Sequence, residues 1–325
     1  MADSGLCRWD DKPWHSLNYE IRHRFGEKLY KLSLNGGFTC PNRDGALGTR
    51  GCIFCSAGGS GDFAASADLS IPDQIAEAKK RVSAKFSGSR YIAYFQAYTG
   101  TYAPIGHLEA IYTQAIEHPN VAVLSIATRP DCLPDDVIRL LVRLNRIKPV
   151  WVELGLQTIH EKTASFIRRG YALPVFEQAV RKLREAGIEV IVHTILGLPG
   201  ESEDDMRKTH DWLAHQPIQG IKIQLLHILR HTDLADIYLK TPFPVLSMDT
   251  YIDLLIHCLE LLPPDMVVHR LTGDGPRGLL IAPTWSLHKK QVLNAILRRF
   301  ESLNTWQGHY FNERRDDRDR PVDLI

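Results

Sequence analysis

Stretches typical of β-strands and α-helices alternate along most of this 325-residue chain, and this alternation limits its fold more than any other feature. Short aliphatic or β-branched runs indicate the strands, and apolar residues every three or four positions indicate the helices. Strands are predicted at 28–34, 91–97, 121–127, 150–156, 188–196, 221–228 and 267–271, and helices at 72–86, 106–117, 201–213, 248–262 and after Pro134 and Pro174. Strand–helix units of this length connect parallel strands, so we expect an α/β barrel or a doubly wound sheet.

One of these strands, residues 150–157, carries polar residues where a buried parallel strand is normally apolar on both faces. Side chains alternate between the two faces of a strand, so Glu153, Gly155 and Gln157 share one face. A carboxylate and an amide on one face, with Gln157 at the carboxyl end, fit the lumen of a barrel where ligand is bound. The alternative is an internal polar pair that hydrogen-bonds a neighbouring loop.

Three of the six cysteines, Cys40, Cys52 and Cys55, fall in a glycine-rich stretch that suits neither a helix nor a regular strand. Such a loop can wrap closely around a small inorganic group. Three thiolates on a [4Fe–4S] cluster leave one iron open to bind another molecule. The alternatives are a zinc site completed by His15 or His23, a redox pair at Cys52 and Cys55, or a chance grouping. Cys7, Cys132 and Cys258 are scattered, and we expect them to be buried thiols.

The sequence around these cysteines, GGFTCPNRDG…GCIFC, resembles the cluster loop of the radical S-adenosylmethionine (SAM) superfamily. The long C-x11-C gap is typical of the branch that contains the catalytic subunit of Elongator, and TRPD at Thr128–Asp131 also matches that branch. The resemblance implies that Cys40, Cys52 and Cys55 hold a [4Fe–4S] cluster. Its fourth iron would chelate the amine and carboxylate of SAM.

The same resemblance implies residues that bind SAM. Phe54, before the last cysteine, fits the family. GLQT at Gly155–Thr158 is similar to the segment that hydrogen-bonds the ribose, which implies Gln157 and its face neighbour Glu153. ILGLPGES at Ile195–Ser202 is similar to the segment that lines the adenine, which implies Gly197 and Leu198.

The family's Gly-Gly-Glu motif normally contacts the amine of SAM, and here the corresponding loop is Ala97–Ala103. It contains Thr99 and Gly100 where the motif has its carboxylate-bearing segment. Backbone contacts at these two residues can remain, whereas a carboxylate contact cannot.

Three polar residues on the later strands are candidates for work on a substrate. Lys222 and Gln224 share a strand face and could point into a barrel lumen, and His193 interrupts an otherwise apolar strand. The alternative for His193 is a core histidine with its hydrogen bonds satisfied.

Near the end, RLTGDGP and APTWSLHKKQVLNAI resemble the C-terminal signature of YhcC-type radical SAM proteins. The resemblance therefore spans the chain from about residue 12 to about residue 305. It implies a partial (β/α)6 radical SAM barrel with N- and C-terminal additions. We expect an N-terminal extension (1–27) packed on the barrel, the core (28–247), a C-terminal helix and strand addition (248–306) and a flexible tail (307–325).

The net charge and the overall composition of the chain exclude few classes of function. The formal net charge is +1, so there is no global attraction to nucleic acid, although basic residues recur at 22–31, 79–81, 168–169 and 289–290. No apolar run approaches ~18 residues and no signal peptide is evident, so we expect a cytoplasmic protein without a membrane partner.

The expected function is that of a radical SAM enzyme. The resemblance implies reductive cleavage of SAM to a 5′-deoxyadenosyl radical, with an electron donor such as flavodoxin or ferredoxin. The Elongator-like branch acts on the wobble uridine of tRNA, which implies tRNA as substrate. The alternatives are a radical SAM enzyme for a small metabolite and a non-enzymatic zinc-binding module.

Overall fold

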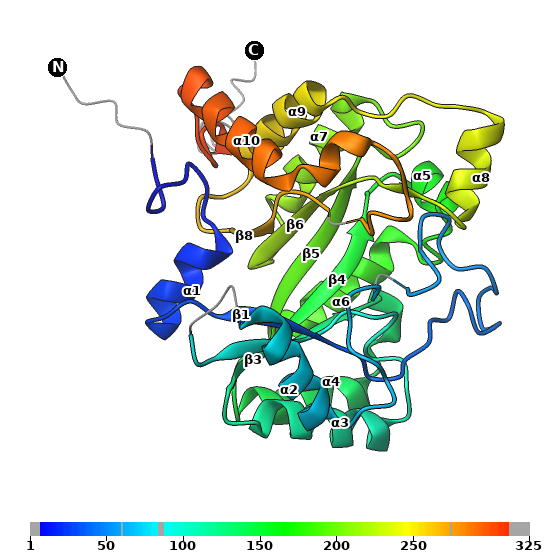
Figure 1. Ribbon diagram of the computed structural model, residues 1–325, viewed down its shortest axis with the longest axis vertical. Helices are drawn as coiled ribbons and strands as arrows, with labels where there is room; N and C mark the ends of the chain where they lie inside the picture. Colours follow the sequence, from blue (N-terminus) through cyan, green and yellow to red (C-terminus); the bar gives the residue numbers. More distant parts are fainter. Residues whose placement is uncertain (1–6, 60, 84–87, 274, 312–325) are drawn as a thin grey trace, which may run out of the picture.

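The computed structural model describes residues 7–59, 61–83, 88–273 and 275–311, and at its centre lies a curved parallel sheet (Figure 1). Seven strands pair in the order β1-β2-β3-β4-β5-β6-β8, and every pair is parallel. The strands are β1 (Tyr30–Leu34), β2 (Tyr91–Phe95), β3 (Val121–Thr128), β4 (Val150–Gln157), β5 (Glu189–Leu196), β6 (Gly220–Leu225) and β8 (Val267–Arg270). The predicted α/β half-barrel is therefore confirmed, with a seventh strand from the C-terminal addition.

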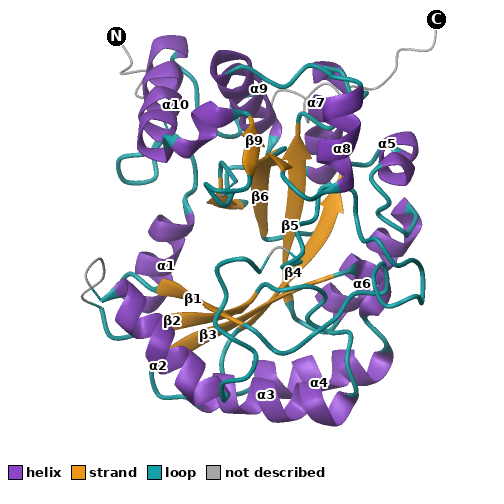
Figure 2. Ribbon diagram, turned by 45° about the vertical axis from the view of Figure 1, so that its right-hand side comes forward, coloured by secondary structure: helices purple, strands orange, loops and turns teal. Residues whose placement is uncertain are grey.

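Helices surround this sheet (Figure 2). Helix α4 illustrates why, because Val137, Leu140, Leu141 and Leu144 recur on one side and are buried. The helices are α1 (Leu17–Phe25), α2 (Ile71–Val82), α3 (Ile105–Glu117), α4 (Asp135–Asn145), α5 (Glu161–Phe166), α6 (Leu173–Glu185), α7 (Glu203–Leu213), α8 (Asp233–Lys240), α9 (Met248–Leu261) and α10 (Lys289–Leu303). No helix in the described ranges combines the length and the apolar character that a bilayer crossing requires.

The smaller elements join the sheet to the C-terminal addition. A short antiparallel pair is formed by β7 (Ile228–Leu229) and β9 (Leu280–Ala282), and two 3-10 helices cover Pro130–Cys132 and Thr284–Leu287. Sequence analysis missed α1, α5, α8, α10 and β9, and it merged β6 with β7.

The two ends of the described chain meet beside β8. Ser16 bridges to Val268, and the Val268 N–H donates to the carbonyl oxygen of His15 at 2.7 Å. The buried amide of Gln307 accepts from the His15 N–H at 2.9 Å and donates to the carbonyl oxygens of Pro263 (2.6 Å) and Met266 (2.8 Å). Residues 307–311 are therefore part of the body, contrary to the expected tail, and 312–325 lie outside the described residues.

Candidate active site

A cavity of about 700 Å³ lies against the inner face of the sheet and is lined by residues of all seven strands and of the cysteine loop. It brings together the three loop cysteines and most of the other candidate residues, namely Phe54, Thr99, Glu153, Gln157, His193, Lys222 and Gln224. Gly100, Gly197 and Leu198 do not line it. The sequence analysis had assigned these three residues to SAM.

The loop that carries the cysteines is folded back on itself. The Gly51 N–H donates to the carbonyl oxygen of Asn42 at 2.7 Å, and the Arg43 guanidinium donates to the carbonyl oxygens of Cys55 (3.2 Å) and Ser56 (2.6 Å). Gly51 has φ +74°, a backbone conformation that residues other than glycine rarely adopt. These bonds keep Cys52 and Cys55 at the cavity.

The chemistry of the three thiols fits a bound iron–sulfur cluster. Burial, followed by the neighbouring Cys55, raises the pKa of Cys52 to about 12, so this thiol is protonated unless a cation lies next to it. Within the described ranges, no three His, Cys, Asp or Glu side chains are grouped to hold one metal ion. A [4Fe–4S] cluster offers a separate iron to each cysteine, so its ligands lie further apart than those of a single ion.

The cysteine loop is joined to the segment after α5. The Asn42 amide donates to Cys52 Sγ at 3.5 Å and to the carbonyl oxygen of Arg168 at 2.8 Å. Gly170 follows with φ +83°, and a Cβ there would lie 2.7 Å from Asn42 Oδ1. The two segments therefore need glycine at this contact.

Arg129, from the TRPD motif, supports the same segment. Its guanidinium makes two hydrogen bonds to the Asp131 carboxylate (2.9 and 2.7 Å) and a third to the carbonyl oxygen of Arg169 (2.8 Å). Arg169 is itself buried and donates to the carbonyl oxygen of Thr158 at 2.6 Å. Of the basic pair at 168–169, Arg169 is thus internal, and Arg168 is paired with Asp233.

Gln157 ends β4, and the oxygen of its side-chain amide has no hydrogen-bond partner among the described residues. Its Oε1 is buried and accepts no hydrogen bond within the described part of the chain, and its backbone has φ +69°. A Cβ at Gly155 would lie 2.9 Å from Gln157 Nε2, so glycine leaves room for the amide. An unpaired buried amide oxygen beside the cysteines suits a ligand hydroxyl, as on the ribose of SAM.

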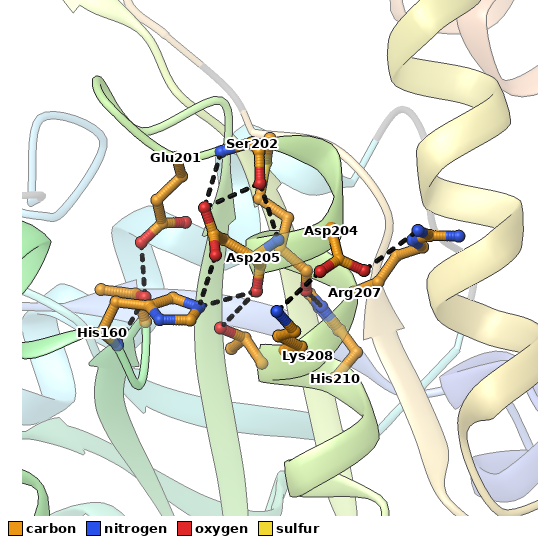
Figure 3. A network of polar contacts seen from close by, with 11 residues as sticks. His160, Glu201, Ser202, Asp204, Asp205, Arg207, Lys208 and His210 are labelled. Atoms are coloured by element: carbon orange, nitrogen blue, oxygen red, sulfur yellow. Dashed lines mark hydrogen bonds and ion pairs between the residues drawn. The ribbon is translucent and has the colours of Figure 1, made fainter.

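The loop between β5 and α7 is fixed by polar contacts (Figure 3). Thr158 donates to the Glu201 carboxylate at 2.6 Å, His160 Nε2 donates to the carbonyl oxygen of Asp205 at 2.8 Å, and Ser202 and Asp205 form a capping box at the start of α7. Burial raises the pKa of Glu201. These contacts join the two loops that follow β4 and β5.

Gly197 and Leu198 begin that loop outside the cavity. Leu198 is buried in an apolar cluster with Ile53 and Ile167, and the Gly197 N–H points to Met206 Sδ at 3.0 Å. Leu198 thereby packs the loop against the cysteine segment.

Glu153 lies at the centre of a polar network in the lumen. Its side chain is fully buried; Oε1 accepts from Lys31 Nζ (3.0 Å) and Ser125 Oγ (2.8 Å), and Oε2 accepts from His193 Nε2 (2.7 Å) and Lys222 Nζ. The donors come from β1, β3, β5 and β6, which the curvature of the sheet brings around one carboxylate. Its two oxygens therefore already have four donors.

The charges of this network follow from burial and proximity. Burial raises the pKa of Glu153, but the ammonium groups of Lys222 and Lys31 outweigh it and hold the pKa well below its ordinary value. Burial and Lys222 lower the pKa of His193 to about 4, so its ring is neutral near pH 7. His193 then donates from Nε2, and Nδ1 can accept from Gln224 Nε2 at 3.5 Å.

Several residues of the site were missed by sequence analysis. Lys31, Ser125 and Tyr94 join the Glu153 network, and Tyr94 OH accepts from Lys222 Nζ at 3.0 Å. The only signal in the sequence that could have indicated these residues is the presence of a lysine and a serine inside predicted β-strands. Cys132 and Cys258 are buried as expected, whereas Cys7 is exposed, contrary to the expectation. Burial and Asp131 raise the pKa of Cys132 to about 12.

The sequence of residues 45–213 matches the radical SAM superfamily, and residues 218–302 match the radical SAM C-terminal domain. The chain is 46% identical over 301 residues to YtqA of Bacillus subtilis, covering 93% of this chain and 94% of YtqA. It is 36% identical over 267 residues to YhcC of Escherichia coli K12, covering 82% and 85% of the two chains.

More distant matches lie on the Elongator side. The tRNA uridine(34) acetyltransferase of Methanocaldococcus jannaschii is 24% identical over 171 residues, which are 52% of this chain and 31% of that protein. The solved structure of archaeal Elp3 from Methanocaldococcus infernus superposes with a TM-score of 0.66 at 15% identity, over 88% of this chain and 67% of the other, which shows a shared fold. Since the matches to YtqA and YhcC cover the barrel and the C-terminal strand and helix alike, this chain belongs to the radical SAM superfamily, among the YhcC-type relatives of Elp3.

Proposed function

We propose that this radical SAM enzyme modifies the wobble uridine of tRNA. The observation that carries the proposal is that the cysteine loop, the unpaired amide of Gln157 and a group of cationic side chains line one cavity. Relatives named for tRNA uridine 34 support the choice of substrate.

Like other members of its family, the protein uses a [4Fe–4S] cluster and SAM and requires a reductant. When bound, the reduced cluster supplies the electron that cleaves SAM into methionine and a 5′-deoxyadenosyl radical, which takes a hydrogen atom from the substrate. In this proposal Cys40, Cys52 and Cys55 ligate the cluster, and Gln157 accepts a hydrogen bond from the ribose.

Other lining residues are assigned supporting roles. Phe54 and Thr99 line the cavity beside the cysteines and are assigned to SAM. Gly100 N–H donates to the carbonyl oxygen of Ala127 at 2.9 Å, so its contribution is to fix that loop. Gly197 and Leu198 are likewise assigned a structural role, which is to position the loop after β5. His193, Lys222 and Gln224 face the substrate, and Glu153 orients the first two.

Cationic residues at the edge of the cavity favour a polyanionic partner. Lys28 and Lys289 are exposed, line the same cavity, and come from opposite ends of the sequence. Of the other basic stretches, Lys79 is bonded to Asn120 and Arg169 is internal. We therefore assign phosphate contacts to the region of Lys28 and Lys289.

The reaction that we propose converts a carboxymethylaminomethyl group at uridine C5 to the aminomethyl form. Its N–CH2 carbon would be oxidised by two electrons, with SAM as the oxidant that becomes methionine and 5′-deoxyadenosine, and water would then release the two-carbon unit as glyoxylate. The test is the profile of modified nucleosides in total tRNA from cells that lack the gene. We expect the carboxymethylaminomethyl form to accumulate at the wobble position. A plasmid that encodes the wild-type chain or Cys258→Ala should restore the profile, and one that encodes Cys55→Ala should not. An unchanged profile in deletion cells would reject tRNA and favour a small-metabolite substrate.

A further inference from the structure

The Glu153 network contains more positive than negative charge. We propose that it is an oxyanion subsite, in which the ammonium groups of Lys31 and Lys222 bind a carboxylate or phosphate of the substrate. The inference deepens the proposed function, because it names the chemical group by which the substrate is recognised.

The excess of positive charge follows from the contacts that Glu153 makes. Two ammonium groups, from Lys31 and Lys222, contact this single carboxylate, and His193 is neutral. One carboxylate balances one of the two ammonium groups, and an anionic ligand can supply the counter-charge for the other.

The described acidic side chains that could serve as counter-ions lie at two separate places in the cavity. Among the described residues that line the cavity, the acidic ones are Glu153 and Asp62. Asp62 accepts a hydrogen bond from Ser56 Oγ, which lies 3.0 and 2.9 Å from its two carboxylate oxygens, near the cysteine loop. Glu153 therefore faces both lysines, and the excess charge remains for a ligand to neutralise.

The described hydrogen bonds of Lys31 and Lys222 do not use all of their N–H donors. An ammonium group has three N–H donors. The described bonds of Lys31 use one of them, on Glu153, and those of Lys222 use two, on Glu153 and Tyr94. The two oxygens of Glu153 already accept from four donors. An incoming anion can therefore accept the remaining N–H groups of the lysines without taking a hydrogen bond that Glu153 needs.

Accessibility favours Lys31 as the first contact. The side chain of Lys31 is 23% exposed, whereas those of Lys222 and Glu153 are 4% and 0% exposed. Burial lowers the pKa of Lys222, which Glu153 opposes, and a second anion would oppose it further. Lys31 thus receives the anion and Lys222 completes the contact.

Two parts of a modified tRNA nucleotide carry this chemistry: the carboxylate of a uridine C5 substituent and the backbone phosphate. The experiment measures binding to the purified holoprotein by isothermal titration calorimetry. The probes are 5-carboxymethylaminomethyluridine against 5-aminomethyluridine, uridine 5′-monophosphate against uridine, and acetate against acetamide. In at least one pair we expect the anionic member to bind at least tenfold more tightly, and that pair identifies the source.

The preference should depend on Lys31. We expect Lys31→Gln to reduce it at least tenfold and Lys31→Arg to retain most of it. Lys80→Gln, at an exposed position on α2, should leave it unchanged. Equal binding within all three pairs in the wild-type protein would overturn the proposal, as would an undiminished preference in a folded Lys31→Gln protein.

Failure of the tRNA assignment is distinguishable from failure of the subsite. If acetate binds in a Lys31-dependent way while the tRNA profile of deletion cells is unchanged, the oxyanion subsite stands and the substrate is a different anion. If the profile changes and no pair shows a preference, the tRNA function stands and the subsite is rejected.

Discussion

Two residues on one face of β4 have opposite hydrogen-bonding states. Glu153 accepts from four side chains, whereas Oε1 of Gln157, at the end of the strand, has no partner in the part of the chain that the structure describes. A satisfied buried carboxylate organises its neighbours, and an unsatisfied buried amide needs a ligand or water. Mutation of the two residues should therefore affect different steps.

Replacing Gln157 by Ala should weaken SAM binding by about 1–2 kcal/mol, because one hydrogen bond in a closed site is lost. The affinity of the reconstituted protein for SAM, measured by calorimetry, checks this. Gln291→Ala, at an exposed position on α10, is the matched control. Unchanged affinity in Gln157→Ala would mean that the amide faces another group.

Replacement of Cys40, Cys52 or Cys55 by Ala should abolish cluster binding, because in the proposed site each of these cavity-lining thiols supplies one ligand to the cluster. Iron content and the visible absorption of anaerobically purified protein measure the loss. Cys258→Ala is the control, since Cys258 is buried in the main core. Full iron content in a variant that lacks two of the three would contradict the assignment.

His210 makes the free energy of unfolding depend on pH. It is buried on α7 (Figure 3), its Nδ1 donates to the carbonyl oxygen of Met206 at 2.8 Å, and burial lowers its pKa from 6.5 to about 4. Between these values the unfolded chain binds the proton more readily, so stability falls as the pH is lowered from 6.5 to 4. The contribution is up to about 1.4 kcal/mol per pH unit.

Replacing His210 by a residue that does not titrate should make the free energy of unfolding depend less on pH. Denaturant unfolding at several pH values should give a shallower slope for His210→Gln than for the wild-type chain. His257→Gln, at an exposed position on α9, should follow the wild type. Parallel curves for His210→Gln and wild type would indicate that the pKa of this histidine is the same in the folded and unfolded chains.

At the scale of elements, the connection from α5 to α6 is the piece that holds the cysteine loop. Asn42, Arg129 and Gly170 meet there, and the positive φ of Gly170 lets the backbone pass close to the Asn42 amide. This connection contains no regular structure, so its geometry depends on side-chain contacts.

Gly170→Ala should destabilise the fold by about 1–3 kcal/mol, since alanine is strained at φ +83° and its Cβ would meet Asn42 Oδ1 at 2.7 Å. Gly106→Ala is the matched comparison. That glycine lies in α3, and its Cβ would meet nothing within 4 Å, so we expect stabilisation of about 0.5–1 kcal/mol. Thermal unfolding measures both. Equal effects of the two substitutions would contradict the proposed strain.

The sequence was sufficient to predict the strands and helices whose hydrophobic pattern lies within the element itself. The strands of the barrel and their helices followed from periodicity, and α10 had the same signal in Val292, Ile296 and Phe300, which was used only as a motif. Helix α5 has six residues and is too short for a periodic pattern. Lys31 and Glu153 are 122 positions apart, and their contact depends on the curvature of the sheet, which alternation alone does not define.

At the scale of the whole molecule, charge is distributed unevenly although its sum is close to zero. The formal net charge is +1, yet Lys28 and Lys289 lie at one cavity. A local basic region can bind a phosphate backbone without strong binding elsewhere on the surface.

If tRNA is the substrate, log Kd should depend linearly on log salt concentration, with a slope set by the number of phosphates contacted. Lys28→Glu combined with Lys289→Glu should reduce that slope by about one to two units, since each lost contact removes roughly 0.7–0.9. Filter binding from low to moderate salt measures it. Lys80→Glu on α2 serves as the control, and binding that is independent of salt would reject the phosphate contacts.

The tail expected from residue 307 shows a limit of reasoning from composition. The segment has few aliphatic residues, yet Gln307 is fully buried and joins three backbone groups. A buried polar side chain can be fixed as firmly as an apolar one when its hydrogen bonds within the protein replace those that it loses to water. The composition of a segment does not reveal such internal hydrogen bonds.

The junction made by Gln307 also determines the order in which the protein can be completed during synthesis. Residues 13–16 leave the ribosome first, but their partners at Val268 and Gln307 are made more than 250 residues later. Strands β1 to β6 pair with neighbours that are close in the sequence and can assemble as they emerge. Trp14 packs against Phe300 of α10, so this contact cannot form until α10 has been released, and Trp14 is available to a chaperone until then.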